Sequence, residues 1–218
     1  SAYTGTAMLG MAPGRPLYKH LGVTGIPMLQ VENASASGST AFRLACHDVA
    51  AGTSDISMVL GVDKMPTALG ASNDTGVPRL DEVHVPPPVH FALLASEYLE
   101  RHGATPEQLA AVAVKNYGNA ALNPNAQRPK ARTLEEVLAG PPIAGPLTRL
   151  QCCPIGEGAA AVVVVSDDAI DELGLDRSRC VRVLASVLRS EELYGAKSFD
   201  AELTRTATAD AYRQAGIG

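Results

Sequence analysis

Ser35 is the residue whose position most directly suggests chemistry, because it lies in a turn of small residues, Asn33-Ala34-Ser35-Ala36-Ser37-Gly38. Residues 27–33 are typical of a short strand, and residues 37–52 of a helix with one apolar face. We therefore expect Ser35 at a helix N-terminus, where free N–H groups and the positive end of the helix dipole stabilise an anion. A cysteine there would ionise readily to a thiolate, whereas a serine hydroxyl needs a general base beside it.

Two roles are open to Ser35. The first is an ordinary N-cap, in which the hydroxyl accepts a hydrogen bond from a backbone N–H group of the first helical turn. The second is a catalytic role, but the sequence contains no G-x-S-x-G motif of the kind that presents a serine to its base in hydrolases. We predict that Ser35 is not acylated, and that the backbone N–H groups around it can still bind an oxyanion.

The composition is typical of a layered α/β protein. Its 218 residues are 46% hydrophobic, which is enough for a sizeable core. The net charge of −5 and the scattered positions of Lys and Arg argue against a nucleic-acid or anionic-membrane partner. No apolar run approaches the roughly 20 residues of a membrane helix, and no signal-peptide pattern is found, so we expect a soluble, cytoplasmic protein.

The four cysteines give no metal-binding pattern. The sequence has no C-x-x-C pair, and no histidine lies at metal-ligand spacing from a cysteine. Adjacent Cys152 and Cys153 would be strained in a disulfide with each other. We therefore expect Cys46, Cys152, Cys153 and Cys180 to be buried, reduced thiols, and we expect no metal.

The apolar patterns predict an α/β core. The strand–helix–strand order between residues 27 and 62 implies a right-handed parallel crossover. The first 16 residues lack periodicity and are predicted to form mainly a loop, whereas the unbroken small and β-branched run 158–165 is predicted to form a central strand. The complete set comprises strands at 27–33, 56–62, 158–165 and 181–188, helices at 16–21, 37–52, 89–102, 106–119, 134–139, 167–173 and 199–215, and loops at 64–88, 120–132 and 190–198.

Four segments resemble motifs of one known family. Residues 31–42 are similar to the turn that carries the nucleophilic cysteine of the thiolase superfamily, with Ser35 in the place of that cysteine. Residues 61–65 and 152–161 are similar to two further family motifs. Residues 115–127 resemble a family loop that begins Lys-Asn-His, with Tyr117 in the place of the histidine. The sequence most closely resembles the sterol-carrier-protein, lipid-transfer-type branch.

The resemblance implies a layered αβαβα fold built from two similar α/β halves. Residues 1–178 would form the N-terminal, nucleophile-bearing half, with a loop insertion at about 64–155, and residues 179–218 would begin the second half. The sequence contains neither the Gly-His-Pro histidine nor the second cysteine motif of the later half. Members of the family pair through the nucleophile half, so the resemblance also implies a homodimer.

Members of this superfamily that lack the cysteine include the steroid side-chain aldolases, and the sequence resembles that branch. These enzymes cleave a β-hydroxy acyl-CoA by a retro-aldol reaction and act with an OB-fold partner of DUF35 type. Such a cleavage needs a base for the β-hydroxyl and donors for the thioester oxygen, but no acyl-enzyme. The resemblance therefore implies an acyl-CoA aldolase that cuts a steroid or similar side chain, with no cofactor beyond the CoA of its substrate.

Two tyrosines are candidates for the proton carrier of such a reaction, provided that neighbours lower the phenol pKa from its usual value of about 10. Tyr194 lies in the loop predicted at 190–198, and Tyr117 lies in the Asn-rich segment 115–127. Functional residues are frequent on loops of this kind. For Tyr117, a packing role with a solvated hydroxyl is an equal alternative.

Two other functions remain open for this sequence. The chain could be a thiolase, and thus an acyltransferase, in which serine has replaced the cysteine at position 35. Alternatively, it could be a non-catalytic thiolase-like subunit that stabilises a partner. The candidate catalytic residues are therefore Tyr194, Ser35 and Tyr117.

Overall fold

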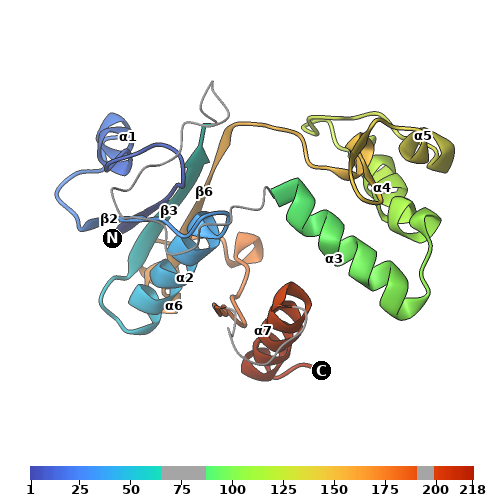
Figure 1. The fold of residues 1–218 in the computed structure, drawn as a ribbon. Helices are drawn as coiled ribbons and strands as arrows, with labels where there is room; N and C mark the ends of the chain where they lie inside the picture. Colours follow the sequence, from blue (N-terminus) through green and yellow to red (C-terminus); the bar gives the residue numbers. More distant parts are fainter. Residues whose placement is uncertain (65–86, 191–198) are drawn as a thin grey trace, which may run out of the picture. The chain divides into compact units, whose positions relative to one another are not determined.

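The computed structural model in Figure 1 describes residues 1–64, 87–190 and 199–218. The chain divides into two units, of which unit 1 contains Ser1–Asn73 and Glu157–Gly218, and unit 2 contains Asp74–Gly156. Unit 2 is therefore an insertion in the sequence of unit 1. The boundaries that we predicted from the resemblance, with an insertion at about 64–155 and a second half from residue 179, stay predictions.

Unit 1 is built around a four-stranded sheet with the strand order β2-β1-β3-β6. The strands are β1 (Ala2–Gly5), β2 (Met28–Val31), β3 (Ile56–Asp63) and β6 (Gly158–Val165). Strand β1 is parallel to both β2 and β3, whereas β6 is antiparallel to β3. The carboxyl ends of β1, β2 and β3 therefore meet at one edge of the sheet. This mixed sheet with its helices confirms the predicted α/β class.

The prediction of a loop at the start of the chain is wrong for Ala2–Gly5, because these residues form strand β1. All four residues are buried, and β1 lies between β2 and β3. The Ala2 N–H group donates to the Pro27 carbonyl oxygen over 2.9 Å. Four residues are too few to show a period, so the neighbouring strands, rather than a pattern within the segment, determine its conformation. Strands β2 and β3 are parallel, as predicted, but they are not adjacent.

Helix α2 (Ser37–Ala50) packs on the sheet of unit 1 through small side chains. Ala41 and Ala45 are completely buried, in one cluster with Tyr3 of β1 and Val59 of β3. Methyl side chains let the helix backbone lie close to the strands while still excluding water. The helix and its apolar face, both predicted, are confirmed.

Glycines let the first turn of α2 lie directly against β1 and β3. An ideal Cβ atom on Gly5 would lie 2.4 Å from the carbonyl oxygen of Ser37 and 2.6 Å from Cα of Gly38. Real Cβ atoms do not come so close to backbone atoms, so only glycine fits at position 5. Its neighbour in the β1–β3 register, Gly61, also faces Gly38, because a Cβ on Gly61 would lie 3.8 Å from Cα of Gly38. Two paired glycines thus form the surface on which the helix begins.

A phenol–carboxylate hydrogen bond connects α2 to strand β1. The Tyr3 hydroxyl donates to Oδ2 of Asp48 over 2.7 Å. Burial, reinforced by the Asp48 carboxylate, raises the pKa of Tyr3 to about 12, and hydrogen bonds from Tyr3 and Ser1 lower the pKa of Asp48. The donor therefore stays protonated and the acceptor stays ionised over the whole neutral pH range.

Residues 158–165 form β6, but β6 is not the central strand that we predicted. In the described part of the chain, β6 lies at the edge of the sheet and pairs with β3. Val162 and Val163 are 49% and 58% exposed. An apolar run predicts burial of both strand faces, but it does not show which element covers them.

The prediction of a strand at 181–188 is wrong, because these residues form no β-ladder with any strand in the described ranges. A strand needs a hydrogen-bonding partner, and apolar residues alone do not provide one. The Ser186 N–H group instead donates to the side-chain oxygen of Gln214 over 3.3 Å.

The remaining helices of unit 1 agree with the predicted helices to within two residues. They are α1 (Gly14–His20), α6 (Asp167–Glu172) and α7 (Phe199–Ala215). Helix α6 has a side-chain cap, since the Ser166 hydroxyl accepts from the Ala169 N–H group over 3.1 Å.

Unit 2 contains helices α3, α4 and α5, which follow the predicted pattern, and a short hairpin, which we did not predict. Thr133 and Glu136 form a capping box at α5, because each side chain accepts from the other residue's backbone N–H group. No described helix is long and apolar enough to cross a membrane. The bounds are α3 (Pro87–His102), α4 (Pro106–Ala120), α5 (Leu134–Leu138), β4 (Pro142–Ala144) and β5 (Leu147–Thr148).

Two predicted loops concern residues outside the described ranges. Most of the loop predicted at 64–88 and nearly all of the loop predicted at 190–198 belong to residues 65–86 and 191–198, which the structure does not describe.

Replacing Gly5 with alanine is expected to destabilise the protein. The new methyl group would overlap backbone atoms of Ser37 and Gly38, so α2 would have to move. We expect the free energy of unfolding, measured by urea denaturation, to fall by about 1–3 kcal/mol or more. Gly158→Ala is the matched control, since nothing lies within 4 Å of a Cβ atom at Gly158. Equal losses for the two variants would contradict the close approach.

Candidate functional site

The carboxyl edge of β1, β2 and β3 is the candidate site, because open α/β sheets bind ligands outside the carboxyl ends of their parallel strands. Three segments reach this edge. Residues 6–9 follow β1, residues 32–36 connect β2 to α2, and Asp63 ends β3. Ser35 lies in the second segment, so the sheet and α2 together determine its position.

The turn that contains Ser35 is locally strained and tightly held. Ala34 has φ = 44°, a left-handed conformation that residues with a side chain adopt rarely and at a cost of about 1–3 kcal/mol. The Ser37 hydroxyl accepts from the Asn33 N–H group over 2.8 Å and donates to the Ala34 carbonyl over 2.7 Å. Oε1 of Glu32 accepts from the Ala34 N–H group over 2.7 Å. These bonds keep the turn in its strained conformation.

Ser35 itself is exposed and does not cap α2. The N-cap is Ala36, with φ = −93° and ψ = 4°, and it makes no side-chain capping bond. The capping role that we considered for Ser35 is therefore wrong, because the turn places Ser35 one residue too early and gives the local bonds to Ser37. The Ser35 hydroxyl has no hydrogen-bond partner among the residues that the structure describes. No described side chain is therefore in place as its general base.

The first turn of α2 has backbone donors to offer a ligand. The Ser37 N–H group donates to the Ala34 carbonyl over 3.2 Å. The N–H groups of Gly38 and Ser39, however, have no acceptor within the described ranges. Together with the positive end of the helix dipole, these donors are suited to a negatively charged oxygen.

Asp63 holds the neighbouring loop at the same edge. Its carboxylate accepts from the Thr6 hydroxyl over 2.9 Å, from the Ala7 N–H group over 2.9 Å and from the Met8 N–H group over 2.8 Å. In the sequence, Asp63 is distinguished only as part of the family motif at residues 61–65. The signal that could have revealed it is an acidic residue at the carboxyl end of a buried strand.

Tyr117 lies in unit 2, on helix α4. Its hydroxyl accepts a hydrogen bond from Nη1 of Arg128 over 3.1 Å. It also lines a cavity of about 560 Å³ whose walls are mainly apolar, with Cys152 and Cys153 among them. The structure thus gives Tyr117 a charged donor and an apolar pocket, which is compatible with either of the two roles considered for it.

The cysteines are less buried than expected. Cys46 and Cys152 are half-buried, whereas Cys153 and Cys180 are exposed. Burial raises the pKa of the Cys46 thiol, so that thiol is a poor nucleophile at neutral pH. The prediction of four buried thiols is therefore wrong for Cys153 and Cys180 and holds only in part for Cys46 and Cys152, because a general preference of cysteine for the interior does not decide a particular position.

The three candidate residues do not form one observed constellation. Ser35 belongs to unit 1 and Tyr117 to unit 2, and Tyr194 lies outside the described residues. Their joint catalytic role stays a prediction. Within the described ranges, no group of three His, Cys, Asp or Glu side chains is arranged to hold a metal ion.

The family of the chain follows from comparison with known proteins. Residues 3–137 match the family model described as "Thiolase, N-terminal domain". The chain belongs to the thiolase superfamily. Its relatives include sterol carrier protein 2, which confirms the branch that the four sequence motifs indicated.

Relatives of this thiolase-superfamily chain are longer than the chain itself. Benzoylsuccinyl-CoA thiolase subunit BbsB of Thauera aromatica is 35% identical, over 100% of the chain and 58% of the relative. Sterol carrier protein 2 of Gallus gallus is 32% identical, over 93% of the chain and 40% of the relative. The chain thus spans about half the length of these curated relatives.

Solved structures confirm the thiolase-like fold. The monomeric SCP2-thiolase-like protein type 1 of Mycobacterium smegmatis matches with a TM-score of 0.68 and 19% identity, over 100% of the chain and 48% of that structure. The Ltp2-ChsH2(DUF35) aldolase matches with a TM-score of 0.65 and 23% identity, over 79% of the chain and 46% of that structure. At these identities the likeness concerns the fold alone.

Replacing Ser37 with alanine is expected to loosen the strained turn. The variant would leave the Asn33 N–H group without its acceptor and remove the bond to the Ala34 carbonyl. We expect a loss of about 1–3 kcal/mol in the free energy of unfolding, measured by chemical denaturation. In the control Ser39→Ala, the exposed serine loses only a bond to the Ala36 carbonyl, and a change within about 0.5 kcal/mol is expected. If Ser37→Ala is no more destabilising than the control, the turn does not depend on Ser37.

Proposed function

We propose that the protein is a thiolase-like acyl-CoA aldolase. It would cleave a β-hydroxy acyl-CoA with a steroid or similar side chain into a ketone and a shorter acyl-CoA. The observation that carries this proposal is the turn at 32–38, where the fold keeps its helix N-terminus but has a serine without a general base within the described ranges. Such a turn can bind an oxyanion but is poorly equipped for acyl transfer.

A retro-aldol reaction makes use of what this turn retains. A base takes the proton from the β-hydroxyl, the Cα–Cβ bond breaks, and the β-carbon becomes a ketone. The electron pair of that bond passes into an enolate, whose oxygen is the former thioester carbonyl oxygen, and the α-carbon then takes up a proton. The N–H groups of Gly38 and Ser39 are suited to hold the enolate oxygen, because they are directed outward from the positive end of α2.

The names of similar proteins support the substrate class and a partner. The relative from Thauera aromatica is named as a thiolase for benzoylsuccinyl-CoA, and another relative is named acetyl-CoA acetyltransferase. The aldolase of similar fold is named Ltp2-ChsH2(DUF35) aldolase. We propose by analogy an acyl-CoA substrate, no cofactor beyond its CoA, an OB-fold partner of DUF35 type and a homodimer through the nucleophile half.

The direct test is the detection of the products. Purified protein, together with its OB-fold partner, is incubated with a β-hydroxy acyl-CoA that carries a steroid side chain, in the absence of free CoA. We expect mass spectrometry to find a ketone and a shorter acyl-CoA in equal amounts. Failure to release ketone under these conditions would exclude the aldolase.

The acyltransferase alternative is tested by restoring the thiol. The favourable position of a thiolate at a helix N-terminus predicts that Ser35→Cys gains thiolysis of a β-keto acyl-CoA by free CoA if the chain is a thiolase with an altered nucleophile. We expect no such gain, and we expect retro-aldol turnover to continue in the variant, because that reaction forms no acyl-enzyme. A clear gain of thiolysis would favour the alternative.

The non-catalytic alternative is tested at the proposed proton carrier. Tyr194→Phe removes the phenol proton, and a general acid–base residue contributes about 10²–10⁴-fold, so we expect kcat to fall by that factor. The control is Tyr212→Phe, because Tyr212 is 53% exposed on α7. If the complex with the OB-fold partner keeps the same kcat in Tyr194→Phe as in Tyr212→Phe, Tyr194 has no catalytic role. That result would support a stabilising subunit.

A further inference from the structure

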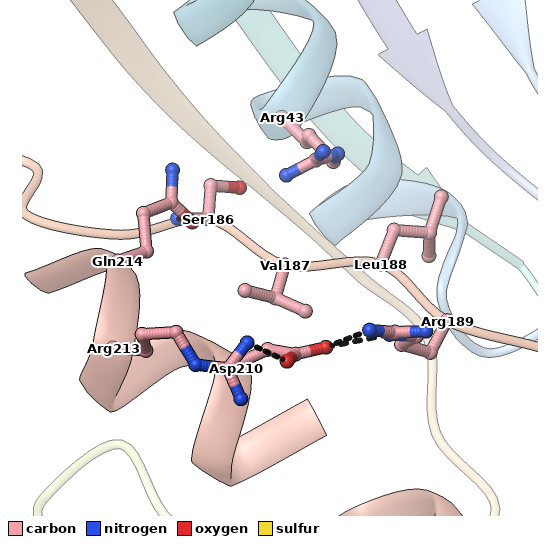
Figure 2. Close-up of a pocket in the computed structure, with 8 residues that line it drawn as sticks. All are labelled: Arg43, Ser186, Val187, Leu188, Arg189, Asp210, Arg213 and Gln214. Carbon is pink, nitrogen blue, oxygen red and sulfur yellow. Dashed lines mark hydrogen bonds and ion pairs between the residues drawn. The ribbon is translucent and has the colours of Figure 1, made fainter. Parts of the chain in front are cut away.

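We propose that unit 1 contains a second binding site, which takes the phosphate group of a small ligand and does not depend on the acyl-CoA aldolase function. The site is a pocket of about 400 Å³ between α2, the segment after residue 185 and α7 (Figure 2). Its charged residues, among those that the structure describes, are three arginines and one aspartate. Among the residues that the structure describes, the lining consists of Arg43, Ser186, Val187, Leu188, Arg189, Asp210, Arg213 and Gln214.

A single carboxylate positions two of the three guanidinium groups. Oδ2 of Asp210 accepts from Nε of Arg189 over 2.6 Å and also contacts Nη2 of Arg189, while Oδ1 accepts from Nη1 of Arg213 over 2.8 Å. Figure 2 shows Asp210 between the two arginines. These hydrogen bonds lower the pKa of Asp210, so the carboxylate stays ionised at neutral pH. Its side chain is 14% exposed, which makes it the fixed centre of the cluster.

The third guanidinium group gives the pocket an excess of positive charge. Arg43 extends from α2 toward the pocket in Figure 2 and forms no ion pair or hydrogen bond with any described residue. Three arginines against one aspartate give the described lining residues a net charge of +2. Like charges held together in this way are unfavourable unless an anion lies between them.

The donors of this pocket suit a phosphate group. A guanidinium presents five N–H donors, and Asp210 occupies only some of those on Arg189 and Arg213. The side-chain oxygen of Gln214 accepts from the Ser186 N–H group, so the amide nitrogen remains as a neutral donor. Hydrogen-bond donors that point into the pocket from several directions suit the tetrahedrally arranged oxygens of a phosphate better than the two coplanar oxygens of a carboxylate. Val187 and Leu188 add apolar wall, which reduces screening by water.

The pocket is separate from the Ser35 turn in its residues and its chemistry. None of its lining residues belongs to the segments at 6–9 and 32–36. Ser35 lies before the first turn of α2, whereas Arg43 lies in the middle of that helix. Loss of the phosphate site should therefore leave retro-aldol turnover measurable, and absence of that turnover should not affect phosphate binding.

The test is titration calorimetry of the purified protein with inorganic phosphate at low ionic strength. We expect saturable binding that weakens about tenfold or more in Arg43→Gln, because each lost charge-assisted hydrogen bond reduces affinity by at least that factor. Arg43→Lys should weaken binding less, because lysine keeps the positive charge and loses only the planar arrangement of guanidinium N–H donors. The control Arg15→Gln removes an exposed arginine of α1 outside the pocket and should change the Kd by less than about twofold.

Thermal unfolding of each variant shows whether it is folded, so a loss of binding in a folded Arg43→Gln supports the site. Adenosine monophosphate and adenosine identify the source of the phosphate. Tighter binding of the nucleotide than of inorganic phosphate, with none of the nucleoside, assigns the pocket to a nucleotide phosphate, and equal binding assigns it to the free anion. No saturable binding of phosphate or nucleotide to the unaltered protein, or equal affinities for Arg43→Gln and Arg15→Gln, would overturn the proposal.

Discussion

The close approach of helix α2 to strands β1 and β3 is the constraint on which the candidate site depends. Gly5 and Gly61 are paired across two neighbouring strands, and the first turn of the helix lies directly against them at Gly38. A side chain at Gly5 would force the helix away from the sheet and change the path of the turn before it. The alanines that follow along α2 continue this close packing. The packing therefore fixes the turn and the helix N-terminus relative to the sheet edge.

The same arrangement separates two properties that a thiolase nucleophile turn combines. Stabilisation of negative charge comes from backbone N–H groups and from the helix dipole, which belong to the fold and survive any change of side chain. Nucleophilicity requires, in addition, a side chain that ionises readily there, such as cysteine. Serine at position 35 removes the second property and leaves the first in place. The proposed retro-aldol reaction needs only the first property, so it requires no change of architecture.

The elements that the sequence predicted well are those with many residues in one pattern. Helix α2 and strand β3 show repeated apolar positions, whereas the four residues of β1 show none and depend on strands from elsewhere in the chain. The turn before α2 could be located but not described in detail, because nothing about alanine favours the positive φ of Ala34 that makes Ala36 the cap. The hydrogen bond between Tyr117 and Arg128 could not be predicted either, because it depends on the conformation of the loop that contains Arg128.

The order of the segments along the chain has a consequence for biosynthesis. Strand β6 completes the sheet by pairing with β3, from Ile56 with Val165 to Asp63 with Gly158, yet the whole of unit 2 is translated between them. The ribosome therefore releases β3 long before its second partner exists, and an unpaired strand edge attracts other unpaired strands. Because ordering distant segments is slow, this edge of β3 lacks its partner β6 until unit 2 and then Gly158–Val165 have been translated.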